Sequence, residues 1–177
     1  MALKQRIDGF MDCVNKDFPA MSVKQVRVAG DSKKCYDAVT TVFTADPSVV
    51  GVYNHSDAVC ASAVTSALRS LGKLHAAGEP GHIVWTAIDG SPDGLKAIRD
   101  GYLDQTQSQP ADLCAKYSVY WLAKAMKGEK VTTGPTDHNS EVKIADGTIT
   151  DVLPATPVTR DNASDPALWG NASKGAK

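Results

Sequence analysis

The chain has 177 residues, of which 42% are hydrophobic and 22% charged, and its 19 basic and 20 acidic side chains leave a net charge of −1. These values are typical of an ordinary globular domain, and the lack of a basic excess argues against nucleic acid as a partner. No apolar run is long enough to span a bilayer, and residues 1–6 lack the apolar segment of an export signal, so we expect neither feature in this chain.

The first half of the chain alternates between helical and strand-like hydrophobic periods, which predicts an α/β fold with a parallel sheet flanked by helices. Apolar residues at helical spacing predict a helix over residues 4–17, and alternating valines predict a strand over residues 23–28. The next predicted unit is a helix that begins after Asp31 and stops at Pro47, followed by a strand over residues 49–53.

The same alternation continues with a helix from Asp57 to Gly72 and a buried strand over residues 82–87. A turn rich in glycine and proline over residues 88–94 then leads into a short helix. A strand over residues 103–108 completes this part of the chain, which thus predicts four parallel strands.

A long helix and a hairpin follow. The helix is predicted over residues 111–127, and two alternating segments, 141–144 and 148–152, flank a turn signal at Asp146. We expect one face of the helix to contact a core through Leu113, Cys114, Tyr117, Tyr120, Trp121 and Met126. Beyond Pro154 the sequence lacks a regular period, which predicts an irregular tail.

Four cysteines lie far apart, without the C-x-x-C spacing of a zinc knuckle or a thioredoxin motif. They are Cys13, Cys35, Cys60 and Cys114. Each lies among apolar residues in a predicted helix, so we expect buried free thiols, although three disulfide pairings stay open.

Polar residues follow the predicted strands at their carboxyl ends, where parallel α/β sheets bind their ligands. Ser56 and Asp89 come after two of these strands, and Gln109 follows the last one. Arg6 in the first helix is a further candidate, because a guanidinium group can hold vicinal hydroxyls or a carboxylate. Together these groups suit a polyhydroxylated ligand, whose hydroxyls both donate and accept hydrogen bonds.

Each candidate also has a structural interpretation. Asp57 or Ser56 can cap the helix that begins there, and Asp89 can shape the turn before Gly90. Gln109 can cap the long helix, and Arg6 can be a surface charge.

Enzymatic interpretations are weaker. The run His55-Ser56-Asp57 contains the residue types of a serine triad, but a triad requires them to converge from separate elements, and no G-x-S-x-G motif is present. His55, Asp57 and Cys60 form one short cluster without a second half, so we expect no metal. Because no glycine-rich nucleotide motif follows a strand either, we expect neither enzymatic activity nor a cofactor.

Several short motifs follow one another in an order that is specific in combination. They read R-I-D-G-F from Arg6, T-A-D-P from Thr44, Y-N-H-S-D from Tyr53, I-D-G-S-P-D-G from Ile88, D-G-Y-L from Asp100 and G-E-K from Gly128. Their order and spacing over residues 6–158 resemble periplasmic sugar-binding proteins of the ribose-binding type, the soluble receptors of ABC importers.

The resemblance implies the type I periplasmic binding protein fold, in which two α/β lobes close on a ligand. It also implies that Arg6, Ser56, Asp89 and Gln109 hydrogen-bond to a sugar. Two departures concern Ser56, where the family usually has asparagine, and Gly30, where it usually has an aromatic ring. They imply a ligand of different shape, such as a linear polyol or a smaller sugar.

The helix of Arg6 corresponds to a position about halfway along such proteins, so the resemblance implies a carboxy-terminal portion and an incomplete fold. Residues 1–109 would form most of the carboxy-terminal lobe. Residues 110–153 would be a helix and hairpin that belong to the amino-terminal lobe of the intact parent, and residues 154–177 a crossover and an irregular tail.

The implied function is binding of a sugar or polyol, without chemistry, for delivery to the membrane permease of an ABC importer in the periplasm or cell envelope. The effector-binding part of a LacI-type transcriptional regulator has the same fold and stays an alternative, as does a fragment without binding activity. Self-association is also expected, because the helix at residues 111–127 would lack its home sheet.

Overall fold

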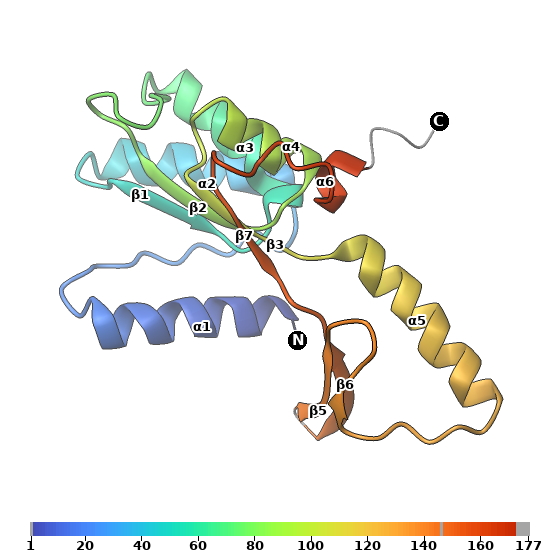
Figure 1. Ribbon diagram of the computed structural model, residues 1–177. Coiled ribbons are helices and arrows are strands. Elements are labelled where there is room, and N and C mark those ends of the chain that lie inside the picture. Colours follow the sequence, from blue (N-terminus) through green and yellow to red (C-terminus); the bar gives the residue numbers. More distant parts are fainter. Residues whose placement is uncertain (1, 146, 173–177) are drawn as a thin grey trace.

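Three parallel strands and one antiparallel strand form the main sheet of the computed structural model, which describes residues 2–145 and 147–172 (Figure 1). The sheet order is β1 (Gly51–Asn54), β2 (Val84–Asp89), β3 (Gln105–Ser108) and β7 (Thr156–Val158). β1, β2 and β3 are parallel as predicted, whereas β7 runs antiparallel to β3 and was not predicted. The α/β fold is therefore confirmed, with a mixed rather than a purely parallel sheet.

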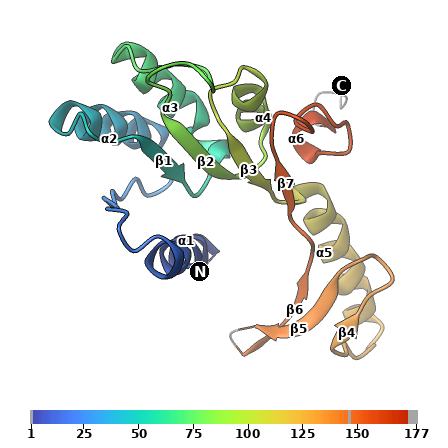
Figure 2. The ribbon, with the colours of Figure 1, turned by 60° about the vertical axis from the view of Figure 1, so that its left-hand side comes forward.

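Three helices cover one side of this sheet, as Figure 2 shows: α2 (Ser32–Ala45), α3 (Asp57–Ser70) and α4 (Pro92–Arg99). α2 begins where Asp31 accepts a hydrogen bond from the Lys34 backbone N–H at 3.1 Å. Between these helices and the sheet lies the core, whose larger members are Val39, Phe43, Val64, Leu68, Trp85, Leu95, Ile98 and Leu103.

The helix α1 (Ala2–Asp17) lies on the other side of the sheet (Figure 2). The strand predicted over residues 23–28 is absent, because residues 21–28 have no ladder partner in the described part of the chain. Val26 is 47% exposed, and this segment forms the connection from α1 to α2. Only Val26 and Val28 have the two-residue spacing of a strand, and without a neighbouring strand they do not produce one.

A second unit extends away from the main sheet (Figure 1). It contains α5 (Ala111–Met126), the hairpin strands β5 (Glu141–Ala145) and β6 (Thr148–Val152), and the short strand β4 (Gly134–Pro135). The predicted hairpin is confirmed, although Asp146 of its turn lies outside the described residues.

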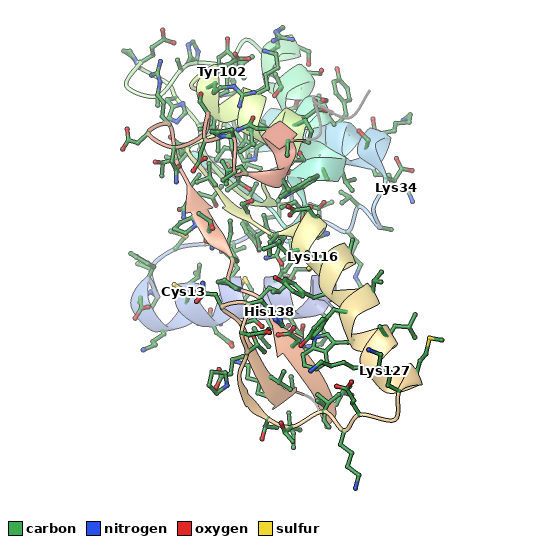
Figure 3. All side chains as sticks on the ribbon, turned by 45° about the vertical axis from the view of Figure 1, so that its right-hand side comes forward. Cys13, Lys34, Tyr102, Lys116, Lys127 and His138 are labelled. Carbon is green, nitrogen blue, oxygen red and sulfur yellow. A yellow bond between two sulfur atoms is a disulfide. The ribbon has the colours of Figure 1, made fainter. Side chains whose placement is uncertain are left out.

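The prediction that α5 faces a core is wrong in part. None of its residues is buried, and Met126 is 81% exposed. Tyr117 nevertheless stacks on His138 with ring centroids 3.7 Å apart, and the Trp121 indole N–H donates to Asp151 at 2.7 Å. One face of α5 therefore contacts the loop before the hairpin and the hairpin itself, and Figure 3 shows His138 between them.

Residues 155–172 are more ordered than predicted, and residues 173–177 of the predicted tail lie outside the described residues. β7 brings Val158 into the core at 0% exposure, and Ala163 and Leu168 are also buried. A short helix, α6 (Trp169–Ala172), packs beside α4. Isolated apolar residues anchor this segment, which explains why it shows no period.

The expectation of four buried free thiols is also wrong. Cys35 of α2 and Cys60 of α3 form a disulfide with 5.6 Å between their Cα atoms. Cys13 and Cys114 are free but exposed. In the part of the chain that the structure describes, no helix is long and apolar enough to cross a membrane.

Candidate functional site

Three of the four predicted site residues meet at the carboxyl ends of β1 and β2. An Arg6 nitrogen, Nη1, lies 2.8 Å from Oδ1 of Asp89, and the Ser56 hydroxyl donates to Oδ2 of Asp89 at 2.6 Å. The Arg6 and Asp89 side chains are only 20% and 15% exposed, so water screens their ion pair less than at an open surface. The three side chains come from α1, the start of α3 and the end of β2, as expected for a ligand-binding edge.

Arg6 is held from two further directions. Its Nη1 also donates to the His55 carbonyl at 2.7 Å, and its own carbonyl accepts from the Tyr53 hydroxyl at 3.1 Å. The rings of Phe10 and Tyr53 stack with centroids 4.1 Å apart. These contacts fix α1 against the end of β1 and direct the guanidinium toward Asp89.

The backbone at Asp89 is unusual. Asp89 has a φ of +123° and Gly90 a φ of +70°, so the chain makes a left-handed corner between β2 and α4. A Cβ on Gly90 would lie 2.6 Å from the Ser108 hydroxyl, and only glycine fits there. We call these two residues the Asp89–Gly90 corner.

Asp57 holds this corner through hydrogen bonds to its backbone. Its carboxylate, in a residue only 1% exposed, accepts the backbone N–H groups of Gly90 and Ser91 at 2.9 Å each and the Thr106 hydroxyl. Burial raises the pKa of the Asp57 carboxyl, and the hydrogen bonds from these groups oppose that shift. The structural interpretation of Asp57 as a helix cap is wrong, because Asp57 is the first residue of α3 and Ser56 occupies the cap position. The Ser56 side chain makes no capping hydrogen bond.

Gln109 joins the cluster through its backbone. Its N–H donates to the Asp89 carbonyl at 2.9 Å, which places Gln109 beside the corner at the start of α5. The Trp169 indole N–H donates to the same carbonyl at 2.7 Å. Sequence reasoning missed Trp169, because it follows Asp89 by 80 residues within a segment without a regular period.

A groove of about 380 Å³ adjoins the cluster between α1 and the sheet. Its lining includes Gln5, Phe10, Tyr53, Gln105 and Gln107 together with Arg6. Amide and guanidinium groups beside aromatic rings are the groups that contact both the hydroxyls and the C–H faces of polar small molecules.

The side chains of His55, Ser56 and Asp57 do not form the hydrogen-bond chain of a serine triad. Ser56 donates to Asp89 rather than to His55, while the Asp57 carboxylate accepts from the corner. Cys60 is in a disulfide, and the described residues contain no group of three side chains suited to hold a metal ion. Burial and the neighbouring Arg6 lower the pKa of His55.

Comparison with known proteins places this geometry in context. Residues 1–130 match the family described as periplasmic binding protein domain. The ribose import binding protein RbsB of Salmonella typhimurium is 35% identical over 101 residues, which cover 57% of this chain and 31% of that protein. RbsB of Escherichia coli K12 gives the same identity and coverage. The chain thus spans about a third of the length of these curated relatives.

Solved structures show the same fold. An ABC transporter solute-binding protein from Agrobacterium vitis with bound D-fucose has a TM-score of 0.73 and 21% identity, covering 93% of this chain and 49% of that one. A solute-binding protein from Bacillus halodurans with bound myo-inositol has a TM-score of 0.71 and 20% identity, covering 91% of this chain and 48% of that one. The described fold therefore corresponds to about half of each.

Proposed function

The chain belongs to the family of periplasmic binding protein domains, and on that premise we propose that Arg6, Ser56, Asp89 and Gln109 form one wall of a sugar- or polyol-binding site. The observation that carries the proposal is the convergence of Arg6 and Ser56 on the Asp89 carboxylate at the carboxyl edge of the sheet. The three groups hold one another in place, and a ligand hydroxyl would find a charged acceptor and a charged donor at one point.

The chemistry of these groups favours hydroxyls over other ligands. Each sugar hydroxyl donates one hydrogen bond and accepts others, so adjacent hydroxyls can donate to Asp89 and accept from Arg6. A formal net charge of −1 over the whole chain gives no reason to expect a polyanionic ligand. The groove beside Arg6, where glutamine side chains lie next to aromatic rings, extends the same chemistry.

We further propose that the intact parent is the solute-binding component of an ABC-type importer. It would bind its ligand without chemistry, without a metal or cofactor, and deliver it to a membrane permease from the periplasm or cell envelope. The curated relatives named as ribose import proteins support this class, as do the fucose- and inositol-bound structural neighbours. The family and fold are those of non-enzymatic solute-binding proteins.

The proposed organisation divides the chain at residues 109 and 153. Residues 1–109 would be most of one lobe, and residues 110–153 would belong to the other lobe of the parent. Residues 154–177 would cross back to the lobe that residues 1–109 form. The separation of α5 and its hairpin from the main sheet supports this division (Figure 1), and the pairing of β7 with β3 supports the return.

The alternative is the effector-binding part of a LacI-type regulator, which would use the same strand-end residues. The import proteins among the curated relatives favour the importer. In the parent sequence, an export signal would agree with the importer, and a DNA-binding helix pair would agree with the regulator.

Titration of the isotope-labelled chain with D-ribose and with myo-inositol, followed by two-dimensional NMR, tests the site. We expect saturable chemical-shift changes at Ser56, Gly90 and Gln109. The affinity should be weak, because a single lobe leaves one side of the ligand exposed to water. Asp89→Asn should weaken binding about tenfold or more, since it removes a charged acceptor while it keeps the size and shape of the side chain.

Asp93→Asn is the matched control. Asp93 also accepts one serine hydroxyl, from Ser62 at 2.7 Å, but lies on the exposed surface of α4 and outside the cluster. We expect its affinity to stay within about twofold of the unmodified chain. Equal affinities of the Asp89 and Asp93 variants, or an absence of saturable shifts, would refute the proposed site.

A further inference from the structure

The carboxy-terminal segment returns to the Asp89–Gly90 corner and closes over it. The Trp169 indole N–H donates to the Asp89 carbonyl at 2.7 Å, and a Cβ on the next residue, Gly170, would lie 2.3 Å from the Gly90 carbonyl oxygen. A residue far along the chain thus contacts the backbone of the one residue on which Arg6 and Ser56 converge.

The corner needs such support because its backbone is strained. A non-glycine residue with φ of +123° is outside the ordinary regions for an L-amino acid and persists only where its surroundings determine it. Two donors hold the Asp89 carbonyl, the Gln109 N–H at 2.9 Å and the Trp169 indole. The N–H of the same peptide group, which belongs to Gly90, points the opposite way and donates a hydrogen bond to the Asp57 carboxylate.

This peptide plane is attached to the Asp89 Cα, so a change in the Asp89 backbone angles that moves the plane would also reorient the Asp89 side chain. Rotation about the corner would move the carboxylate away from the Ser56 hydroxyl and the Arg6 guanidinium, which lie only 2.6 and 2.8 Å from it. Shifts well below 1 Å are sufficient to weaken charge-assisted hydrogen bonds at these distances.

We infer that Trp169 is a positioning residue of the proposed sugar site, which holds the Asp89 carbonyl so that the Asp89 carboxylate meets Arg6 and Ser56. The inference rests on the proposed function for its binding consequence. It extends the site beyond residues 1–130, where the family match ends, to the carboxy-terminal segment.

The segment has attachments other than the indole N–H. Leu168 and Ala163 are buried in the core, and Arg99 donates to the Ala163 carbonyl at 2.9 Å and to the Asn171 side chain at 3.1 Å. Removal of the indole N–H alone should therefore leave the segment docked and affect mainly the corner.

Trp169→Phe tests the inference, with Trp121→Phe as the matched control. Both indoles donate to an oxygen at 2.7 Å, but the acceptor of Trp121 is Asp151 in the second unit. With D-ribose as the probe in NMR titrations, Trp169→Phe should weaken binding about fivefold through loss of one neutral hydrogen bond at the corner. Trp121→Phe should leave the affinity within about twofold.

Amide hydrogen exchange supplies a readout that does not require a ligand. Trp169→Phe should accelerate exchange selectively at Gln109, Gly90 and Ser91, while amides in the centre of α3 keep their protection. A second substitution of the same residue, Trp169→Leu, should reproduce both effects, because it also removes the N–H and keeps an apolar side chain.

The two readouts separate the inference from the proposed function. Unchanged ribose affinity in Trp169→Phe, relative to Trp121→Phe, would overturn the positioning role, as would unchanged exchange at the corner. If the unmodified chain does not bind ribose, the proposed function fails for that sugar, and exchange then decides the inference. Selective loss of protection at the corner supports it, and unchanged protection overturns it.

Discussion

At the residue scale, the Asp89–Gly90 corner determines the geometry of the candidate site. Gly90 combines a φ of +70° with close contact to Ser108, so both its backbone and its missing side chain matter. Gly72 at the end of α3 has a similar φ of +65°, but a Cβ added there would have no neighbour within 4 Å. Substitution of Gly72 would therefore introduce backbone strain alone, whereas substitution of Gly90 would introduce backbone strain and a steric conflict with Ser108.

Gly90→Ala should destabilise the chain more than Gly72→Ala does. A left-handed alanine costs about 1–2 kcal/mol at either position, and the conflict with Ser108 should add about 1–3 kcal/mol at Gly90. Urea unfolding of both variants measures the difference in the free energy of unfolding. Equal losses would show that the corner can relax and that Ser108 does not confine it.

The residues of the candidate site were predictable from sequence to different degrees. Ser56 lies two residues after β1 and Asp89 is the last residue of β2, so the strand-end rule placed both at one edge. The roles of Asp57 and Trp169 were not predictable in the same way. They depend on which distant backbone groups each side chain contacts, and neither the hydrophobic period nor residue spacing records such contacts.

At the element scale, a disulfide joins α2 to α3. Cys35 and Cys60 are 25 residues apart in sequence, and both lie in the core of the main sheet. Closing a loop of this length restricts the unfolded chain and should stabilise the fold by about 3 kcal/mol. The cross-link therefore fixes the two helices that precede and follow β1.

Replacement of both bridged cysteines by alanine should lower the free energy of unfolding by about 3 kcal/mol. The control is the double replacement of Cys13 and Cys114, which are free and exposed and should change it by less than about 0.5 kcal/mol. Urea unfolding with and without reductant measures both. Equal stability of the two double variants would contradict the prediction.

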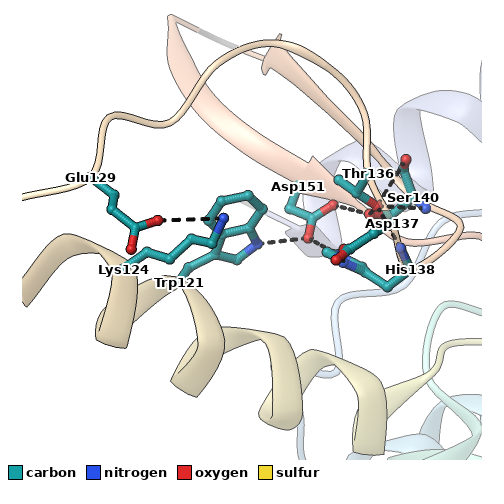
Figure 4. Close-up of polar contacts among 8 residues, drawn as sticks. All are labelled: Trp121, Lys124, Glu129, Thr136, Asp137, His138, Ser140 and Asp151. Atoms are coloured by element: carbon teal, nitrogen blue, oxygen red, sulfur yellow. Dashed lines mark hydrogen bonds and ion pairs between the residues drawn. The ribbon is translucent and has the colours of Figure 1, made fainter. Parts of the chain in front are cut away.

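A histidine lies at the contact of α5 with the hairpin (Figure 4). His138 contacts Asp151 at 2.9 Å and Asp137 at 2.8 Å, and its side chain is 6% exposed. The hydrogen bond to Asp151 and the charges of both carboxylates raise the pKa of His138. Burial opposes a low pKa for Asp151, but hydrogen bonds from Ser140, His138 and Trp121 lower it.

This arrangement predicts that α5 loosens as the pH rises. A histidine pKa that is raised in the folded state stabilises fully below its unfolded value of about 6.5, and the stabilisation is lost as the pH passes through the folded value. Lys124 lies over the Tyr120 and Trp121 rings and stays charged throughout this range. Hydrogen exchange over residues 111–126 should therefore accelerate above about pH 6.5, beyond its ordinary base-catalysed increase.

His138→Gln supplies the control for this pH effect, since glutamine can hydrogen-bond but does not titrate in this range. The variant should lose the additional pH dependence over residues 111–126 while α3 exchanges as before. The same pH dependence in the variant would assign the effect to another group.

Element boundaries were predictable where local signals agreed with the tertiary structure. The cap at Asp31 and the glycine at Gly72 marked helix ends that the structure confirms. The predictions of a strand at residues 23–28 and of a buried face on α5 were wrong, because burial there depends on which elements pack alongside. A period in the sequence shows that a face is apolar and not what covers it.

At the scale of the whole molecule, the main sheet and the α5 unit differ in how well each buries its apolar residues. The side of α5 that faces away from His138 carries three exposed aliphatic residues, Val119, Leu122 and Met126, at 67%, 61% and 81% exposure. Full burial of each such side chain is worth about 1.5–3 kcal/mol. A surface of this kind on one helix favours association through that helix.

We expect the 177-residue chain to associate with itself in a concentration-dependent manner through α5. Light scattering after size-exclusion chromatography should show a rising mass with concentration, and Leu122→Glu combined with Met126→Glu should suppress it, because two buried charges oppose the contact. Met21→Glu is the control, since Met21 is also exposed, at 53%, but lies in the loop between α1 and α2. A chain that stays monomeric at all concentrations, with strong exchange protection across residues 111–126, would show that α5 needs no partner, and the proposal that it belongs to another lobe would have to be abandoned.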